Sequence, residues 1–65
     1  MTVGEKIRDL RHQRGLTQAD VAERLNIDRT TYSKYETNHI EPSITILAKL
    51  TLIYNVDYNC LLMVN

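Results

Sequence analysis

The stretch GLTQADVAERLNIDRTTYSKYE, residues 15–36, decides the fold of this 65-residue chain. Two helix-start signals, Thr17 and Asp28, stand only eleven positions apart in it. Threonine and aspartate favour helix N-termini because their side-chain oxygens accept hydrogen bonds from free backbone N–H groups of the first turn. Two short helices joined by so little chain must meet at a sharp angle, and the second must project part of its surface outward.

Further boundary signals show that these are the second and third helices of the chain. Thr2, followed three residues later by Glu5, is a capping-box pattern that begins a first helix, and Gly15 ends it. Asn26 closes the second helix, since asparagine tolerates the left-handed backbone region better than other non-glycine residues. The third helix is expected to span about residues 29–37.

The last third of the chain predicts two more helices. Pro42 disfavours helix at the residue before it and Ser43 is a good N-cap, so a fourth helix begins there. This helix is apolar almost all round, which predicts that both of its faces are covered. Asn55 ends it, and a short fifth helix follows Asp57. With no strand pattern, we expect one compact all-α domain of five helices over residues 1–65.

Composition argues against several classes of protein. Cys60 is the only cysteine, so no intramolecular disulfide is possible, and no His/Cys cluster suggests a metal site. The chain shows no signal peptide and no run approaching the ~20 apolar residues of a membrane span, which favours a cytoplasmic protein without a membrane partner. No nucleophile–base pair, carboxylate dyad or phosphate-binding loop is visible, so neither an enzyme nor a cofactor is expected.

The charge balance argues mildly against a nucleic-acid partner. Eight Lys and Arg residues balance eight Asp and Glu residues, whereas nucleic-acid-binding domains are usually basic. Seven of the eight basic residues lie between Lys6 and Lys34, interspersed with acidic ones. Any positive face must therefore arise from the local placement of side chains and not from net charge.

A tight turn at Asn26 and Ile27 makes the second and third helices a helix-turn-helix unit. Ala22 suits this unit because a larger side chain would hold the two helices apart. The outer edge of the third helix then carries polar side chains: Arg29, Thr30, Ser33 and Lys34. Such an edge fits the DNA major groove, about 12 Å wide, where arginine and lysine suit guanine and threonine can touch a thymine methyl. The alternative is a solvated helix face without a ligand.

Two tyrosines share the other side of the third helix. Tyr32 and Tyr35 are three residues apart, so they lie on one side of a helix. Their rings could be platforms for base stacking. Their place in the motif favours packing in the core instead, with both hydroxyl groups reaching the surface.

The stretch 15–36, followed by EPSITILAKL, closely resembles the phage repressor/Cro-like (XRE-family) helix-turn-helix DNA-binding proteins. The order Gln-x-x-x-Ala, a turn, Ser-Lys-Tyr-Glu and then Pro-Ser carries the resemblance, which runs from about Ile7 to Leu62. It implies a lambda repressor-like fold in which Arg29, Thr30 and Lys34 contact bases. Asparagine stands where the family usually has glycine, at positions 26, 38 and 55, which is physically tolerable.

The resemblance also implies contacts away from the bases. The residues expected to approach the DNA backbone are Thr17, Gln18, Ser33, Asn38 and His39. Gln18 would in addition support the first residue of the third helix. Arg11 and Glu36 match a pair that forms a salt bridge between the first and third helices, although they could instead be independent surface charges worth about 0–1 kcal/mol.

A symmetric homodimer is the expected assembly, because apolar residues in the last two helices exceed what so small a core needs. The residues expected at the dimer interface are Ile46, Leu52, Cys60, Leu62, Met63 and Val64. They could instead complete the core of a monomer.

The expected function is a sequence-specific transcriptional regulator, a repressor that reads a palindromic operator in double-stranded DNA. The alternative is a protein-interaction module, such as an antitoxin that binds a toxin and has secondary DNA binding.

Overall fold

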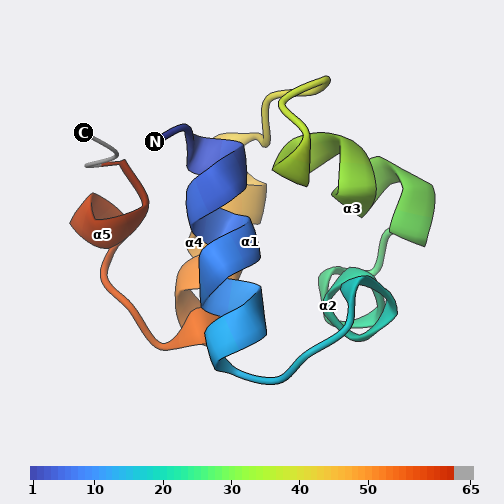
Figure 1. Ribbon diagram of the computed structural model, residues 1–65, viewed down its shortest axis with the longest axis horizontal. Coiled ribbons are helices and arrows are strands. Elements are labelled where there is room, and N and C mark those ends of the chain that lie inside the picture. Colours follow the sequence, from blue (N-terminus) through green and yellow to red (C-terminus); the bar gives the residue numbers. More distant parts are fainter. Residues whose placement is uncertain (63–65) are drawn as a thin grey trace.

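The computed structural model describes residues 1–62 and contains five helices over that range (Figure 1). The helices are α1 (Val3–Gln13), α2 (Gln18–Leu25), α3 (Arg29–Glu36), α4 (Ile44–Tyr54) and α5 (Tyr58–Leu62). α1 and α4 lie at the centre of the molecule, with α5 on one side and α2 and α3 on the other. The residues described form no strand, so the all-α, five-helix prediction is confirmed.

Side-chain caps begin the first four helices where the sequence predicts. The capping residues are Thr2, Thr17, Asp28 and Ser43. In α1 the Thr2 hydroxyl accepts from the backbone N–H of Glu5 at 3.1 Å, and the Glu5 carboxylate accepts from the N–H of Thr2 at 2.8 Å. α2 repeats this reciprocal pair with Thr17 and Asp20. Each box satisfies two backbone donors that have no partner within the helix.

Left-handed residues follow the helices at the predicted positions. Asn26 and Asn55 end α2 and α4 with φ angles of 59° and 53°. Gly15 and Asn38 lie just beyond the ends of α1 and α3, with φ angles of 66° and 64°. These φ values lie in the region that asparagine and glycine tolerate and most residues avoid. The connections can therefore be short and sharp.

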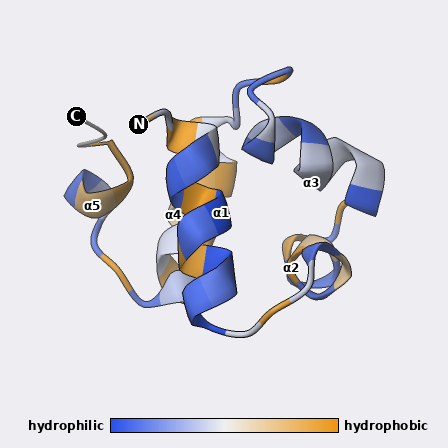
Figure 2. Cartoon of the chain, viewed as in Figure 1, coloured by the Kyte–Doolittle hydropathy of each residue, from blue (hydrophilic) through white to orange (hydrophobic). Residues whose placement is uncertain are grey.

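The core collects buried side chains from all five helices. Its members are Ile7, Leu10, Val21, Ala22, Leu25, Tyr32, Tyr35, Leu47, Leu50, Tyr54 and Leu61. α3 differs from the other helices because it carries no aliphatic residue, as its pale and hydrophilic colours show (Figure 2). It is held in the core by tyrosines and a carboxylate instead. No helix in the described part of the chain is long and apolar enough to cross a membrane.

Two expectations about burial are wrong. α4 is not covered on both faces within one chain, because the side chains of Ile44 and Leu52 are 76% and 82% exposed. Both hydroxyl groups of the tyrosine pair on α3 were expected at the surface, yet Tyr32 is fully buried. Its hydroxyl group finds a partner inside the core, the hydroxyl of Tyr54 at 2.7 Å, so it has no need of water.

Candidate nucleic-acid interface

α2 and α3 form the sharp helix pair that the sequence predicts. Ala22, the small residue expected in this unit, is buried on α2 and only 2% exposed. After the left-handed Asn26, the backbone N–H of Ile27 donates back to the carbonyl of Ala22 at 3.0 Å. This closes α2 tightly, and Asp28 caps α3 immediately afterwards. The turn leaves α3 along one edge of the molecule (Figure 1).

The outward side of α3 is a polar surface with a shallow groove, which we call the α3 face. The residues that line it are Arg29, Thr30, Ser33, Lys34, Thr37 and His39. All three residues expected to contact bases belong to this set, and all three are exposed. The opposite side of α3 is buried through Tyr32, Tyr35 and Glu36. The helix therefore separates its polar edge from its anchoring side.

The cations of the α3 face are available for a ligand. Over residues 1–62, Arg11 and Glu36 form the only ion pair, so Arg29 and Lys34 are held by no carboxylate of the described chain. The nearest acidic group in sequence, Asp28, is occupied with capping: a hydrogen bond from the Thr31 hydroxyl lowers the pKa of its carboxyl group. Although the formal net charge of the chain is zero, this surface presents two free cationic side chains.

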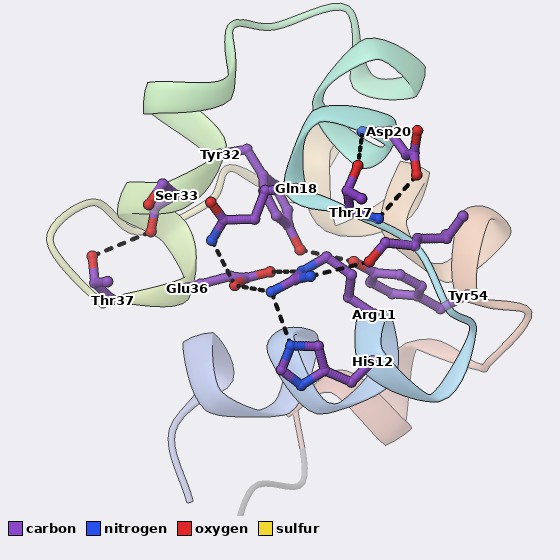
Figure 3. A network of polar contacts seen from close by, with 11 residues as sticks. Arg11, His12, Thr17, Gln18, Asp20, Tyr32, Ser33, Glu36, Thr37 and Tyr54 are labelled. Atoms are coloured by element: carbon purple, nitrogen blue, oxygen red, sulfur yellow. Dashed lines mark hydrogen bonds and ion pairs between the residues drawn. The ribbon is translucent and has the colours of Figure 1, made fainter.

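Gln18 lies at the first turn of α2 and reaches toward the far end of α3. Its side-chain amide donates to Oε1 of Glu36 at 3.0 Å (Figure 3). The resemblance implied support for Arg29, the first residue of α3, whereas this amide contacts the last one. Thr17, one residue earlier, is exposed, and its hydroxyl is used by the capping box. The N-terminus of α2 thus lies against the C-terminal end of α3.

Asn38 and His39 follow α3 and differ in their surroundings. The side chain of Asn38 accepts from the backbone N–H of Gly4 at 3.2 Å and donates to the Thr2 hydroxyl at 2.9 Å. It therefore ties the end of α3 to the start of α1. His39 is exposed and pairs through Nδ1 with the Thr37 hydroxyl at 2.7 Å. Contact of either residue with a DNA backbone stays a prediction.

Arg11 and Glu36 form a buried, two-pronged ion pair (Figure 3). Nε of Arg11 lies 2.7 Å from Oε2 of Glu36, and Nη2 lies 3.1 Å from Oε1. The two residues are 8% and 5% exposed. Arg11 also donates to the backbone carbonyl of Leu16 at 3.0 Å, so the pair connects α1, the loop after it and α3. A planar guanidinium suits such bidentate binding of a carboxylate.

The ionisation of this network follows from its contacts. Burial acts to raise the pKa of Glu36, but hydrogen bonds, led by that from Arg11, outweigh it and leave the pKa below its ordinary value. The hydrogen bond to Glu36 in turn raises the pKa of Arg11. Burial raises the pKa of Tyr54 to about 12 and that of Tyr32 further still. At neutral pH the network therefore contains one ion pair and two neutral hydroxyl groups.

The residues expected at a dimer interface differ in their exposure. Leu52 and Leu62 are exposed, whereas Ile46 packs against the core and Cys60 is only partly exposed. Met63 and Val64 lie outside the described residues. Among residues 1–62, no three His, Cys, Asp or Glu side chains gather as a metal site would require.

Ile44 is absent from the expected interface residues, yet it is one of the most exposed apolar side chains. It lies on α4 at positions i, i+4 and i+8 with Ala48 and Leu52, all three of them exposed. This spacing places them on one side of the helix. Because α4 is apolar on almost every side, its sequence alone gives no signal that would have identified Ile44.

Comparison of the sequence with known proteins finds a matching family and several relatives. The model of the family described as helix-turn-helix (HTH_3) matches residues 7–59. Over 62 residues the chain is 37% identical to the HTH-type transcriptional regulator ImmR of Bacillus subtilis (strain 168), a match that covers 95% of this chain and 49% of that protein.

Two phage proteins are similar over shorter stretches. The immunity repressor protein of Bacillus phage phi105 is 38% identical over 47 residues, which is 72% of this chain and 33% of the repressor. The cryptic phage CTXphi transcriptional repressor RstR of Vibrio cholerae is 39% identical over 51 residues, 78% of this chain and 46% of RstR. The chain spans about half the length of these relatives, or less.

Proposed function

Because the chain belongs to the helix-turn-helix family of DNA-binding domains, we propose that it is a sequence-specific transcriptional repressor that binds double-stranded DNA in the cytoplasm. The observation that carries this proposal is the α3 face, an exposed polar helix edge with two unpaired cations on a helix that is anchored from behind. The names of the relatives agree with it, since ImmR is a transcriptional regulator and the phi105 and CTXphi proteins are repressors.

In this proposal α3 lies in the major groove and its side chains read base edges. Arg29 and Lys34 donate to the O6 and N7 acceptors of guanine, and Thr30 contacts a base or a thymine methyl group. Arg29 and Thr30 stand in the first turn of α3, the part of a recognition helix that reaches deepest toward the bases. Reading is specific because each base pair shows a distinct pattern of donors and acceptors in that groove.

Contacts to phosphate fix the position of the domain on the DNA. The N-terminus of α2 offers free backbone N–H groups and the positive end of the helix dipole, which suit an anion. Thr17 and Gln18 stand at this point, and the second hydrogen of the Gln18 amide remains free for a phosphate while the first binds Glu36. Ser33, Asn38 and His39 would contact the backbone from the other side of α3.

A homodimer on a palindromic operator is the form that we propose for binding. One α3 face supplies few base contacts, and a formal charge of zero adds little general attraction to DNA. Two copies would place their α3 helices in successive major grooves about 34 Å apart. The exposed apolar side of α4, formed by Ile44, Ala48 and Leu52, is the surface we assign to the contact between copies.

Selection from a random duplex library tests the proposal directly. The purified protein would be used at two salt concentrations, and the retained duplexes sequenced. An enriched palindrome with half-sites one helical turn apart is the expected result. Enrichment of no sequence, with weak and strongly salt-dependent binding, would reject the proposal and redirect the search to a protein partner, as for an antitoxin.

A matched pair of variants adds a control to this selection. Lys34→Ala removes a charge from the α3 face, and Arg8→Ala removes one from the exposed side of α1. The first should change which bases are enriched, because a base contact is lost. The second should leave the enriched sequence intact, because Arg8 lies outside the α3 face.

A further inference from the structure

The helix that we propose reads DNA, α3, is held largely by polar contacts. α3 has eight residues and buries only Tyr32, Tyr35 and Glu36. Two of these three make hydrogen bonds to other helices: Glu36 accepts from Arg11 of α1 and from Gln18 of α2, and Tyr32 pairs with Tyr54 of α4. Figure 3 shows these side chains converging behind α3. The anchoring side of α3 therefore relies on directional contacts more than on aliphatic packing.

The hydroxyl pair of Tyr32 and Tyr54 is the deepest of these contacts. Both residues are 0% exposed, and their oxygen atoms are 2.7 Å apart. The ring of Tyr54 is itself held by Arg14, whose guanidinium carbon lies 6.0 Å from the ring centroid. Phenylalanine would fill the same space at both positions without burying polar atoms, which cost free energy unless they are paired. The two hydroxyl groups thus add a directional hydrogen bond to this contact but little additional buried apolar surface.

The orientation of α3 matters because hydrogen bonds from its side chains to base edges tolerate little displacement. A helix has a radius of about 5–6 Å with its side chains, so a turn of about 10° about its own axis moves the outer edge by about 1 Å. Hydrogen bonds to base edges weaken steeply at such displacements, and binding sites must be held within about 10–20° of the productive geometry. Apolar contact alone is non-directional and constrains such a turn weakly.

We propose that Tyr54 is a positioning residue for DNA reading: through the hydroxyl group of Tyr32 it fixes the rotation of α3 about its axis. Arg29 and Lys34 then meet the base edges in one register. Glu36, held by Arg11 and Gln18, fixes the far end of the helix, and the tyrosine pair fixes its middle. This inference rests on the proposed function, because it assigns Tyr54 a role in the sequence preference of the α3 face.

The double variant Tyr32→Phe/Tyr54→Phe tests the inference. It removes both hydroxyl groups together, so no buried donor is left without a partner and stability should stay close to that of the wild type. Affinity would be measured for the selected operator and for a scrambled duplex, together with the melting temperature. Tyr58→Phe, which removes a hydroxyl group from exposed Tyr58 on α5, is the matched control.

The expected result is a loss of preference and not a general loss of binding. The ratio of operator to scrambled affinity should fall by about fivefold or more, the lower end of what one well-placed base contact supplies. Affinity for the scrambled duplex should hold, because phosphate contacts survive a small turn of α3. Selection with the double variant should give flatter base preferences at the positions read by Arg29 and Lys34.

The outcomes separate this inference from the proposed function. An unchanged affinity ratio in a folded double variant would overturn the positioning role and leave the repressor proposal intact. A wild-type protein without any sequence preference would overturn both. If the double variant does not fold, Tyr54→Phe alone removes the same hydrogen bond while leaving the Tyr32 hydroxyl without this partner, and an unchanged ratio in the folded single variant also counts against the inference.

Discussion

Gly4 lies where the start of α1 comes close to the end of α3. A Cβ atom there would lie 2.5 Å from the carbonyl oxygen of Glu36 and 2.6 Å from that of Tyr35. Both are backbone atoms at the end of α3, so no side chain can move aside to make room. The absence of a side chain at Gly4 therefore sets how closely the start of α1 approaches the end of α3.

Gly4→Ala should destabilise the protein by about 1–3 kcal/mol, the usual cost of forcing extra volume into a packed site. It should also weaken operator binding, because α3 must shift to accommodate the methyl group. Urea unfolding followed by circular dichroism measures the first effect. Gly15→Asn is the control: Gly15 has open space around it and a φ of 66° that asparagine tolerates. Equal stability of both variants would mean that the close approach at Gly4 is not rigid.

At the scale of the element, α3 is the reader in the proposed function, and its side chains should differ in what they read. Arg29→Ala should cost about 1–3 kcal/mol of operator affinity and relax the preference at one base position. Titration of the variant against operators that differ at single positions measures both effects. Arg8→Ala on α1 serves as the charge control. An equal loss on every duplex would make Arg29 a phosphate contact instead of a base contact.

The link between α1 and α3 should appear in the pH dependence of stability. The pKa of Glu36 in the folded protein lies below its ordinary value. The contribution of Glu36 to the free energy of unfolding is therefore present above the pKa of the unfolded state, and it is lost as the pH falls through the pKa of the folded state. Stability should therefore decline below about pH 5. Glu36→Gln should remove part of that decline, since glutamine does not ionise. Acid titration of unfolding for both proteins makes the comparison.

Some acid sensitivity should remain in Glu36→Gln. The carboxyl groups of Glu5, Asp20 and Asp28 also have lowered pKa values, because each takes part in a helix cap.

At neutral pH, Glu36→Ala should cost about 3–5 kcal/mol, because it leaves the Arg11 charge buried without a partner. An unchanged melting temperature in Glu36→Ala would show that the ion pair does not support the fold.

Helix boundaries could be predicted from the sequence because their causes are local. Each cap joins a residue to one three positions later, as Thr2 joins Glu5, and each left-handed asparagine acts on its own backbone. The network behind α3 depends on pairs far apart in the chain: Gln18 and Glu36 are 18 positions apart, and Tyr32 and Tyr54 are 22 apart. No periodic pattern in the sequence indicates partners so far apart; only a resemblance to a known family can suggest them.

At the scale of the whole molecule, the exposed side of α4 could not be assigned from periodicity. α4 is apolar on almost every side, so its sequence predicts burial all round. Only the packing of the other helices decides which side stays open, and it is the side with Ile44 and Leu52. An apolar side of this kind on so small a domain is typical of an interface.

Leu52→Lys tests whether this side joins two copies. Leu52 is 82% exposed in the single chain, so a lysine there should leave the fold of the monomer intact. In the proposed dimer it would bury an unpaired charge from each copy, which is costly. The variant should sediment as a monomer at concentrations where the wild type sediments as a dimer. Gln13→Lys adds the same charge at the exposed end of α1 and should remain dimeric.

The same variant connects assembly to DNA reading. A monomer can occupy only one half-site at a time, so Leu52→Lys should bind a full palindrome no better than an isolated half-site. The wild type should prefer the full palindrome strongly, because the second α3 helix binds from an already tethered copy. A wild type that sediments as a monomer at high micromolar concentration and reads half-sites singly would remove the homodimer from the proposed function, and the apolar side of α4 would then need a different partner.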